Sequence, residues 1–147
     1  RIPVYRLYDR QTGTHFYTSS SEERLQVVAK YPQYSDENIA FYAYGDVASD
    51  RNPVYRFYNN RTGTHFYTIS GDERANVQSN YPWFAFEGIS WYASPGSVNA
   101  STPMYRFYNT RTDTHFYTIS AAERDVVQNN YPEFRFEGVG YYAWQAP

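Results

Sequence analysis

The chain repeats itself, and this repetition limits its architecture more than any other feature of the sequence. Three segments that begin at Pro3, Pro53 and Pro103 align without a gap at a spacing of 50 residues. The segments between them, GDVASDRN and PGSVNAST, are short, polar and rich in residues typical of turns. One copy alone is too small to bury its own apolar face, so we expect the copies to share a core. The sequence therefore predicts a single domain, residues 1–147, whose repeats are 3–50, 53–100 and 103–147.

Each copy contains the same order of predicted elements. In the second copy, VYRFYN alternates aromatic and other side chains as a strand does, RTG supplies a turn, and THFYT begins a second strand. The pattern Ser-x-x-Glu, present as Ser70 and Glu73, is typical of a capping box at the start of a helix, and Pro82 ends that helix. FEGISWYA then predicts a third strand, in which Gly88 marks a bulge or a close backbone approach. The repeat is therefore predicted to be β-β-α-β.

Three such units predict a β-rich α+β fold that closes around a pseudo-threefold axis as a small barrel or a propeller-like ring. A β-trefoil is the alternative, because it has the same threefold repetition and nearly the same repeat length. The capping box argues against it, since a trefoil has no helix in each unit. Asp113 stands where the other copies have Gly13 and Gly63, which indicates a turn position with a left-handed backbone.

The charges and the absence of cysteine argue against several classes of function. Thirteen Lys and Arg residues oppose fifteen Asp and Glu residues, so the net charge of −2 does not favour nucleic acid or an anionic membrane as a partner. No apolar run approaches the length of a membrane span, and we expect no membrane insertion. Without cysteine there is no disulfide, no thiolate nucleophile and no cysteine metal site. The sequence does not indicate an oligomeric state.

The apolar residues are mostly aromatic, with 18 Tyr, 10 Phe and 3 Trp. Tyrosine combines an apolar ring with a polar tip, which suits a partly exposed surface. The pattern PVYRFYN..TGTHFYT.S..ER resembles a Tyr-rich tandem repeat, a domain of uncharacterised function found in secreted bacterial and fungal proteins, often beside hydrolase domains. The resemblance covers essentially the whole chain. It implies an extracellular, non-catalytic accessory role, such as attachment to a cell wall or another glycan, and it implies no site residues.

Five positions carry the same Arg, His or Glu in all three copies and are represented in the first copy by Arg6, His15, Glu23, Arg24 and Glu37. The capping box explains Glu23. We expect Arg24 to pair with a carboxylate such as Glu37. For Arg6, in the middle of a strand between tyrosines, we expect stacking on aromatic rings.

Three hypotheses account for the recurring His15, His65 and His115. Each histidine donates to a backbone carbonyl and is structural, or the three converge on one zinc ion, or each lies in a pocket and bonds to a sugar hydroxyl. The surrounding residues favour the sugar pocket over the zinc site, because a pyranose needs an aromatic face and fixed donors and acceptors. The predicted ligand-binding residues are Asp9, His15, Glu37, Phe41, Asn59, His65, Glu87, Trp91, Asn109, His115, Glu137 and Tyr141.

The first and second copies differ from the rest near these residues. Asp36 stands where the other copies have Phe86 and Phe136, so we expect a weaker or altered pocket in the first copy. Trp83 occurs only in the second copy, where it is either an exposed platform or a core residue.

Three similar constellations fit binding better than catalysis, which usually needs one asymmetric site. The sequence contains no nucleophile elbow, phosphate loop or zinc-protease helix. Glycoside hydrolysis stays open, because Glu23 and Glu37 could approach each other. We therefore predict a non-catalytic, multivalent, lectin-like module that binds cell-wall or cell-surface glycans without a metal or cofactor. The alternative is a protein-interaction or cell-wall attachment domain, accessory to a hydrolase, whose Tyr-rich surface docks onto a polypeptide.

Overall fold

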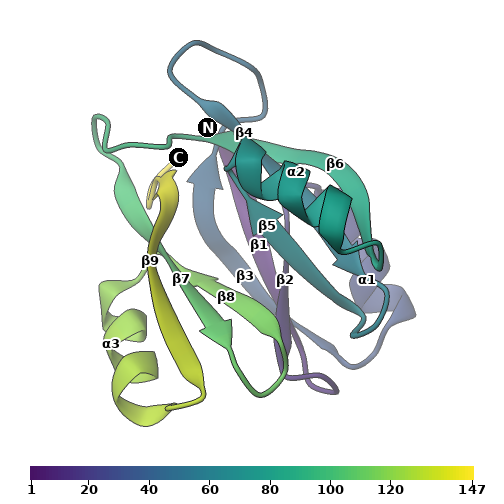
Figure 1. Ribbon diagram of the computed structural model, residues 1–147. Coiled ribbons are helices and arrows are strands. Elements are labelled where there is room, and N and C mark those ends of the chain that lie inside the picture. Colours follow the sequence, from purple (N-terminus) through teal and green to yellow (C-terminus); the bar gives the residue numbers. More distant parts are fainter.

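The computed structural model describes residues 1–147 and consists of three similar units (Figure 1). The first unit contains β1 (Ile2–Asp9), β2 (Thr14–Thr18), α1 (Ser21–Lys30) and β3 (Tyr34–Ala43). The second contains β4 (Asn52–Asn59), β5 (Thr64–Thr68), α2 (Gly71–Asn80) and β6 (Phe84–Ala93). The third contains β7 (Thr102–Asn109), β8 (Thr114–Thr118), α3 (Ala121–Asn130) and β9 (Phe134–Ala143). The predicted β-β-α-β order is confirmed in every unit, and the fold is a β-rich α+β fold.

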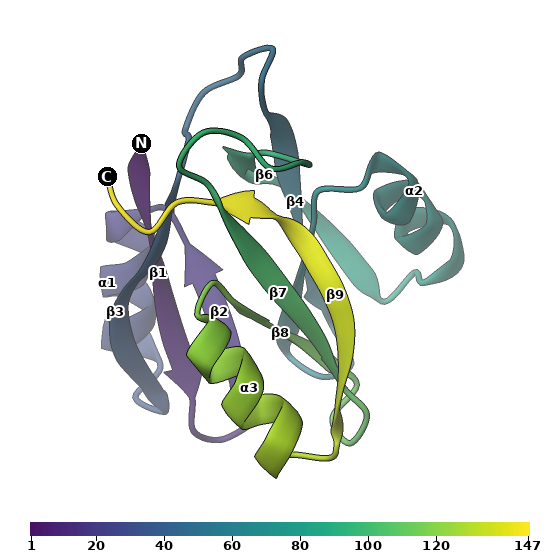
Figure 2. The same cartoon turned by 90° about the vertical axis from the view of Figure 1, so that its left-hand side faces the viewer.

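Every unit has its own antiparallel sheet of three strands, with orders β2-β1-β3, β5-β4-β6 and β8-β7-β9. Ladder pairing between units is limited to three isolated bridges, Tyr42–Trp144, Tyr44–Tyr92 and Ser94–Tyr142. The prediction of a small barrel is therefore wrong, because the sheets stay separate and do not close. Figures 1 and 2 show each helix on the outside of the molecule, beside the sheet of its own unit. Closure of the units around a pseudo-threefold axis stays a prediction.

Each helix begins at a serine cap, as the sequence predicts. The Ser20 hydroxyl accepts a hydrogen bond from the Glu23 N–H at 3.0 Å, and Tyr31 ends α1 by donating its N–H to the Val27 carbonyl at 2.9 Å. The Ser20 N–H, which a complete capping box would bond to the Glu23 side chain, donates instead to the Thr18 hydroxyl at 3.0 Å. The Glu23 carboxylate is therefore available for another partner.

The core is shared by all three units. Fourteen buried residues form one cluster, to which corresponding positions such as Val4, Val54 and Met104 contribute from each unit. Two smaller clusters, each containing one helix valine, lie within the second and third units. Burial of apolar surface against the other units stabilises each sheet, which explains why a single repeat would not suffice.

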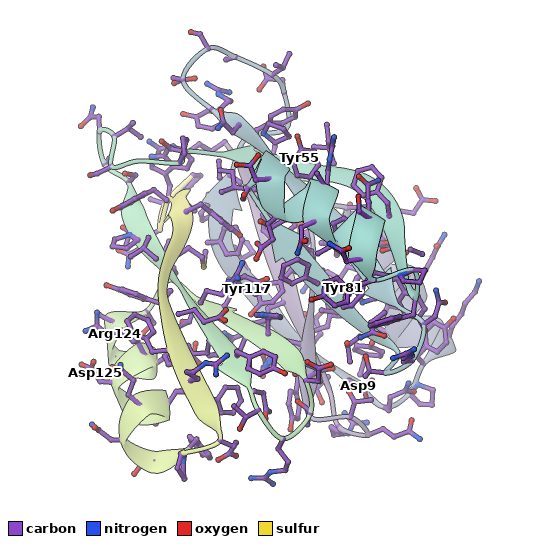
Figure 3. All side chains as sticks on the ribbon, in the orientation of Figure 1. Asp9, Tyr55, Tyr81, Tyr117, Arg124 and Asp125 are labelled. Carbon is purple, nitrogen blue, oxygen red and sulfur yellow. The ribbon has the colours of Figure 1, made fainter.

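Three tyrosines in this cluster join the units through a cycle of hydrogen bonds. Tyr17, Tyr67 and Tyr117 pack edge to face, with ring centroids 5.6–5.9 Å apart. The Tyr17 hydroxyl donates to the Tyr117 carbonyl, that of Tyr117 to the Tyr67 carbonyl, and that of Tyr67 to the Tyr17 carbonyl, each at 2.6 Å. Figure 3 places Tyr117 close to the middle of the molecule, between the units.

This cycle contributes to keeping the sheets separate. The carbonyl acceptors belong to β2, β5 and β8, each of which is an edge strand of its sheet. An edge strand exposes backbone groups that lack a strand partner, and such groups normally recruit another strand. Here a tyrosine hydroxyl of a neighbouring unit occupies one backbone carbonyl of each edge strand, so that carbonyl is not available to a strand of the next unit.

Candidate functional site

Several pockets lie where one unit meets another, and three of them contain one recurring histidine each. The first–second pocket has a volume of about 470 Å³, is lined by residues of the first and second units, and contains His65. The third–first pocket, also of about 470 Å³, contains His15. The second–third pocket is smaller, about 270 Å³, and contains His115. The chain thus carries three related histidine-containing cavities at its unit boundaries.

An arginine in the middle of a strand binds two glutamates at each boundary. In the first–second pocket, the Arg56 Nε donates to Glu87 Oε1 on β6 at 2.8 Å. Its Nη1 and Nη2 donate to the two carboxylate oxygens of Glu23 on α1, at 2.9 and 3.0 Å. Bidentate, charge-assisted contacts of this kind fix both partners in position. The corresponding groups are Arg6 with Glu37 and Glu123, and Arg106 with Glu137 and Glu73.

These contacts keep the carboxylates ionised. Burial opposes the ionisation of Glu23, yet hydrogen bonds from Arg56 and Thr18 hold its pKa below the ordinary value. The hydrogen bond from His115, against a smaller effect of burial and together with Arg106, lowers the pKa of Glu137 to about 2. The carboxylates of Glu23 and Glu137 therefore act as fixed acceptors and not as proton donors.

The histidine ring packs between its own unit and the neighbouring one. The ring of His65 lies 4.6 Å from that of Phe16 in the first unit and 5.1 Å from that of Tyr58 in its own unit, measured between centroids. Burial and the neighbouring Arg56 lower the pKa of His65 to about 3. Its imidazole is therefore neutral near pH 7, and the 3.4 Å approach of His65 Nε2 to Glu87 Oε1 is a polar contact, not an ion pair.

The histidines do not converge on a common point. His15, His65 and His115 line different pockets, and tyrosines form the contact that joins all three units. No group of three or more His, Cys, Asp or Glu side chains in the structure could hold a metal ion. The hypothesis of a zinc ion shared by the three histidines is therefore wrong.

Each of the two larger pockets contains predicted binding residues from two different repeats. His65 and Glu87 share the first–second pocket with Asp9 of the first unit, and not with Asn59 of their own repeat. His15 and Glu37 likewise share the third–first pocket with Asn109 of the third unit. In the third unit, His115 Nε2 lies 3.4 Å from Glu137 Oε1. The expectation that one repeat supplies one complete pocket is wrong.

Asp9, Asn59 and Asn109 are buried and hold the turn that follows the first strand of each unit. The Asp9 Oδ1 accepts hydrogen bonds from the N–H groups of Gln11 and Thr12 at 2.8 and 3.3 Å. Asn59 and Asn109 accept the corresponding bonds in the other units. These residues therefore have a structural role, in addition to the contact that Asp9 and Asn109 make with a pocket.

Phe41, Trp91 and Tyr141 cannot offer the stacking faces that we predicted for them. Their exposed fractions are 2, 2 and 3 %, and all three belong to the central cluster, because their strand positions face the core. The aromatic surface of the pockets comes from other residues that the sequence analysis did not select. These include Tyr31, Tyr131 and Tyr81, which cap the ends of the helices and are 50, 47 and 40 % exposed. In the sequence each of these tyrosines precedes a proline, as Tyr81 precedes Pro82, and this proline indicated only the end of a helix.

The ion pairs correct one further expectation, the pairing of Arg24 with Glu37. Arg24 pairs with Asp36 at 2.7 Å and stacks over Tyr5, while Glu37 binds Arg6. Asp36, the first-copy replacement for a phenylalanine, is thus an ion-pair partner outside the pockets. Trp83 lines the second–third pocket, where the Arg61 guanidinium carbon lies 3.6 Å from the centre of its ring.

Comparison with known proteins identifies one family. The model of the family described as "Domain of unknown function (DUF5648)" matches residues 2–144, which is nearly the whole chain. No curated protein and no solved structure matches the sequence or the fold. None of the three helices has the length and apolar character needed to cross a bilayer.

Proposed function

We propose that this chain, which belongs to the DUF5648 family of domains of unknown function, is a non-catalytic module that binds glycans in its three boundary pockets. One observation carries the proposal, namely a half-exposed tyrosine beside a fixed group of arginine, glutamate and histidine. In the first–second pocket, these residues are Tyr31, Arg56, Glu87 and His65. An aromatic face stacks on the apolar side of a pyranose, and its hydroxyls need both donors and acceptors.

The polar groups of this pocket meet that need. Neutral His65 has one ring nitrogen that donates and one that accepts. The carboxylates of Glu23 and Glu87 accept, and Arg56 holds both in place. Because the partners are fixed before any ligand arrives, a sugar would lose little free energy to their ordering.

The carboxylates support binding rather than glycoside hydrolysis. A hydrolase of the usual kind needs one carboxyl group with a raised pKa that protonates the leaving group. Arg56 and Thr18 instead lower the pKa of Glu23 against the effect of burial. Glu23 and Glu37, the pair that left hydrolysis open, also line different pockets.

Three pockets on one body favour a repetitive ligand such as a polymer or a glycan-coated surface, because weak sites then gain from avidity. The cycle of hydrogen bonds among Tyr17, Tyr67 and Tyr117 supports the pseudo-threefold arrangement that would make the pockets equivalent. We propose that the module acts outside the cell, at a cell wall or cell surface, which rests on the resemblance to repeats of secreted proteins.

Binding of the intact chain to a glycan array, with and without EDTA, tests the proposal. We expect EDTA-insensitive binding that falls at least about tenfold in a variant with Tyr31→Ala, Tyr81→Ala and Tyr131→Ala together. Leu25→Ala is the control, because Leu25 is exposed on α1 and lines none of the pockets. Absence of binding to any glycan, or binding that the triple variant leaves unchanged, would refute the proposal.

A protein partner is the second candidate, because β3, β6 and β9, the third strand of each unit, expose apolar side chains. These are Ile39, Phe86, Ile89, Phe136 and Val139. A polypeptide that docks on this surface would leave the pockets free. Charged substitutions at Phe86 and Ile89 would then abolish capture of the partner, whereas the triple tyrosine variant would not affect it.

A further inference from the structure

The first–second pocket is more negative than the third–first pocket, and its charge bears on the class of glycan that the proposed function requires. Three carboxylates, those of Asp9, Glu23 and Glu87, line it together with one guanidinium, that of Arg56. Because His65 is neutral near pH 7, the net charge of the groups that line this pocket is −2. The pocket is a cavity with aromatic walls, so this charge faces a space of about 470 Å³ that a ligand can occupy.

We infer that the first–second pocket prefers glycans that carry a protonated amino group, such as glucosamine oligomers, over neutral and anionic glycans. This inference rests on the proposed function and names the class of sugar for one of its sites. An ammonium group in the pocket is attracted by the carboxylates and by the faces of the aromatic side chains. Those side chains are Phe16, Tyr31, Tyr34 and Tyr58.

Asp9 distinguishes this pocket from the third–first pocket, which has Asn109 at the corresponding position. Its turn does not need a negative charge, because Asn59 and Asn109 make the corresponding bonds with a neutral amide. Asp9 is 4 % exposed and pairs with no arginine or lysine in the structure. The Asp9 carboxylate accepts hydrogen bonds from backbone N–H groups but has no cationic partner, so it can attract a bound ammonium group without competition from an arginine or lysine.

A second difference of the first copy lies beside Asp9. Tyr34 stands where the other copies have Phe84 and Phe134, and it lines the same pocket as Asp9. Burial, with a further contribution from Asp9, raises the pKa of Tyr34 to about 12, so its hydroxyl stays protonated. Two polar replacements of the first copy thus meet in one cavity. Figure 3 marks Asp9 at the end of β1, next to the turn.

The third–first pocket provides an internal comparison. It contains Asn109 at the position of Asp9, and its lining adds Arg111, which pairs with Glu133 at 2.8 Å. The guanidinium groups of Arg6 and Arg111 and three carboxylates line this pocket, so its net charge is −1 when His15 is not counted. The carboxylates are those of Glu37, Glu123 and Glu133. The preference for a cationic sugar should therefore be weaker in this pocket.

Calorimetric titration of the intact chain with three tetrasaccharides tests the inference. The probes are a glucosamine tetramer, its N-acetylated counterpart and a galacturonate tetramer, at pH 6 and low salt. We expect the amine to bind most tightly and the acid most weakly. Asp9→Asn should weaken binding of the amine by about 3- to 10-fold and change binding of the acetylated tetramer by less.

Both variants, Asp9→Asn and Asn109→Asp, exchange residues that the chain itself uses at this position of the repeat. Asp9→Asn introduces the residue found at Asn59 and Asn109, so the turn is retained, and Asn109→Asp creates the reciprocal change in the third–first pocket. Asn109→Asp should strengthen binding of the amine. Equal affinity for amine and acetylated tetramers, unaffected by Asp9→Asn, would overturn the charge preference while glycan binding stands. Absence of binding to all three probes and to the array would refute the proposed function and this inference with it.

Discussion

Arg56 reaches across a unit boundary to Glu23, with its Nη1 and Nη2 atoms 2.9 and 3.0 Å from the two carboxylate oxygens. Corresponding pairs join the third unit to the second and the first unit to the third. Each unit therefore supplies one arginine and one glutamate to a cycle that includes the first and last repeats. The tyrosine hydroxyls form a second such cycle in the core. Units tied in this way are expected to unfold together.

Replacing Arg56 with methionine should lower the free energy of unfolding by about 1–3 kcal/mol. Methionine fills much of the same volume, but Glu23 and Glu87 are left half-buried without their cationic partner. Urea unfolding followed by circular dichroism measures the change.

The control for this variant is Arg111→Met, because Arg111 also pairs with a glutamate but is 72 % exposed in its side chain. An exposed pair of this kind contributes roughly 0–1 kcal/mol. Equal losses for Arg56→Met and Arg111→Met would show that the boundary pairs contribute no more than a surface ion pair.

Replacing Tyr67 with phenylalanine should cost about 1–3 kcal/mol. The Tyr67 hydroxyl accepts from the Tyr17 N–H at 2.9 Å and donates to the Tyr17 carbonyl at 2.6 Å, so its removal leaves two buried backbone groups without partners. Tyr55→Phe is the comparison, since Tyr55 lies outside the central cluster and its hydroxyl makes none of these bonds. A thermal midpoint of Tyr67→Phe no lower than that of Tyr55→Phe would contradict this role of the cycle.

The protein should lose stability as the pH falls below about 6.5. The pKa of His65 is 6.5 in the unfolded chain and about 3 in the folded one, because burial and Arg56 disfavour the imidazolium. Between these values the unfolded state binds the extra proton, so the free energy of unfolding decreases by up to about 1.4 kcal/mol per pH unit for this group. Glu23 and Glu137, whose pKa values are also lowered on folding, add to the loss below about pH 4.5.

Thermal unfolding at intervals from pH 7.5 to pH 4 checks this prediction. In His65→Phe the decrease between pH 6.5 and 4.5 should become smaller, because that range lies above the ordinary pKa of the glutamates. The same slope in the variant and the parent chain would exclude His65 as its cause.

The local elements could be predicted because their determinants lie within a few residues of one another. Ser70 and Pro82 mark the beginning and the end of α2. Gly13, Gly63 and Asp113 have φ angles of 74, 72 and 59°, which confirms the left-handed turn position that the Gly-to-Asp replacement indicated. Nothing beyond the repeat itself was needed for either conclusion.

The pockets could not be predicted as a whole, because each combines residues of two repeats. Glu23 had a sufficient local explanation as a capping residue, and no pattern in the sequence connects it to Arg56. The buried position of Trp91 was missed for a different reason. The pairing of β4 with β6 shifts register between Val54 and Tyr55 and again between Arg56 and Phe57. Simple alternation therefore does not identify which face of β6 meets the core.

The register shift between Arg56 and Phe57 lies next to Gly88, which pairs with Arg56, and this gives a final prediction. Gly88 has a φ of 93°, and a Cβ atom there would meet nothing within 4 Å, so only the backbone conformation disfavours a side chain. Gly88→Ala should therefore lower the free energy of unfolding by about 1 kcal/mol. Gly88→Asn should cost less, because Asn38 adopts a φ of 67° at the same place in the first unit.

Gly71→Ala is the matched control for Gly88→Ala, because Gly71 also has open space around its Cα but does not have a positive φ. It occupies the first position of α2, where the third unit has Ala121, and alanine there should raise the free energy of unfolding by about 0.5–1 kcal/mol. Opposite signs for the two substitutions in urea unfolding would attribute the cost at Gly88 to its left-handed backbone. A loss of stability in both, or in neither, would contradict this origin of the bulge.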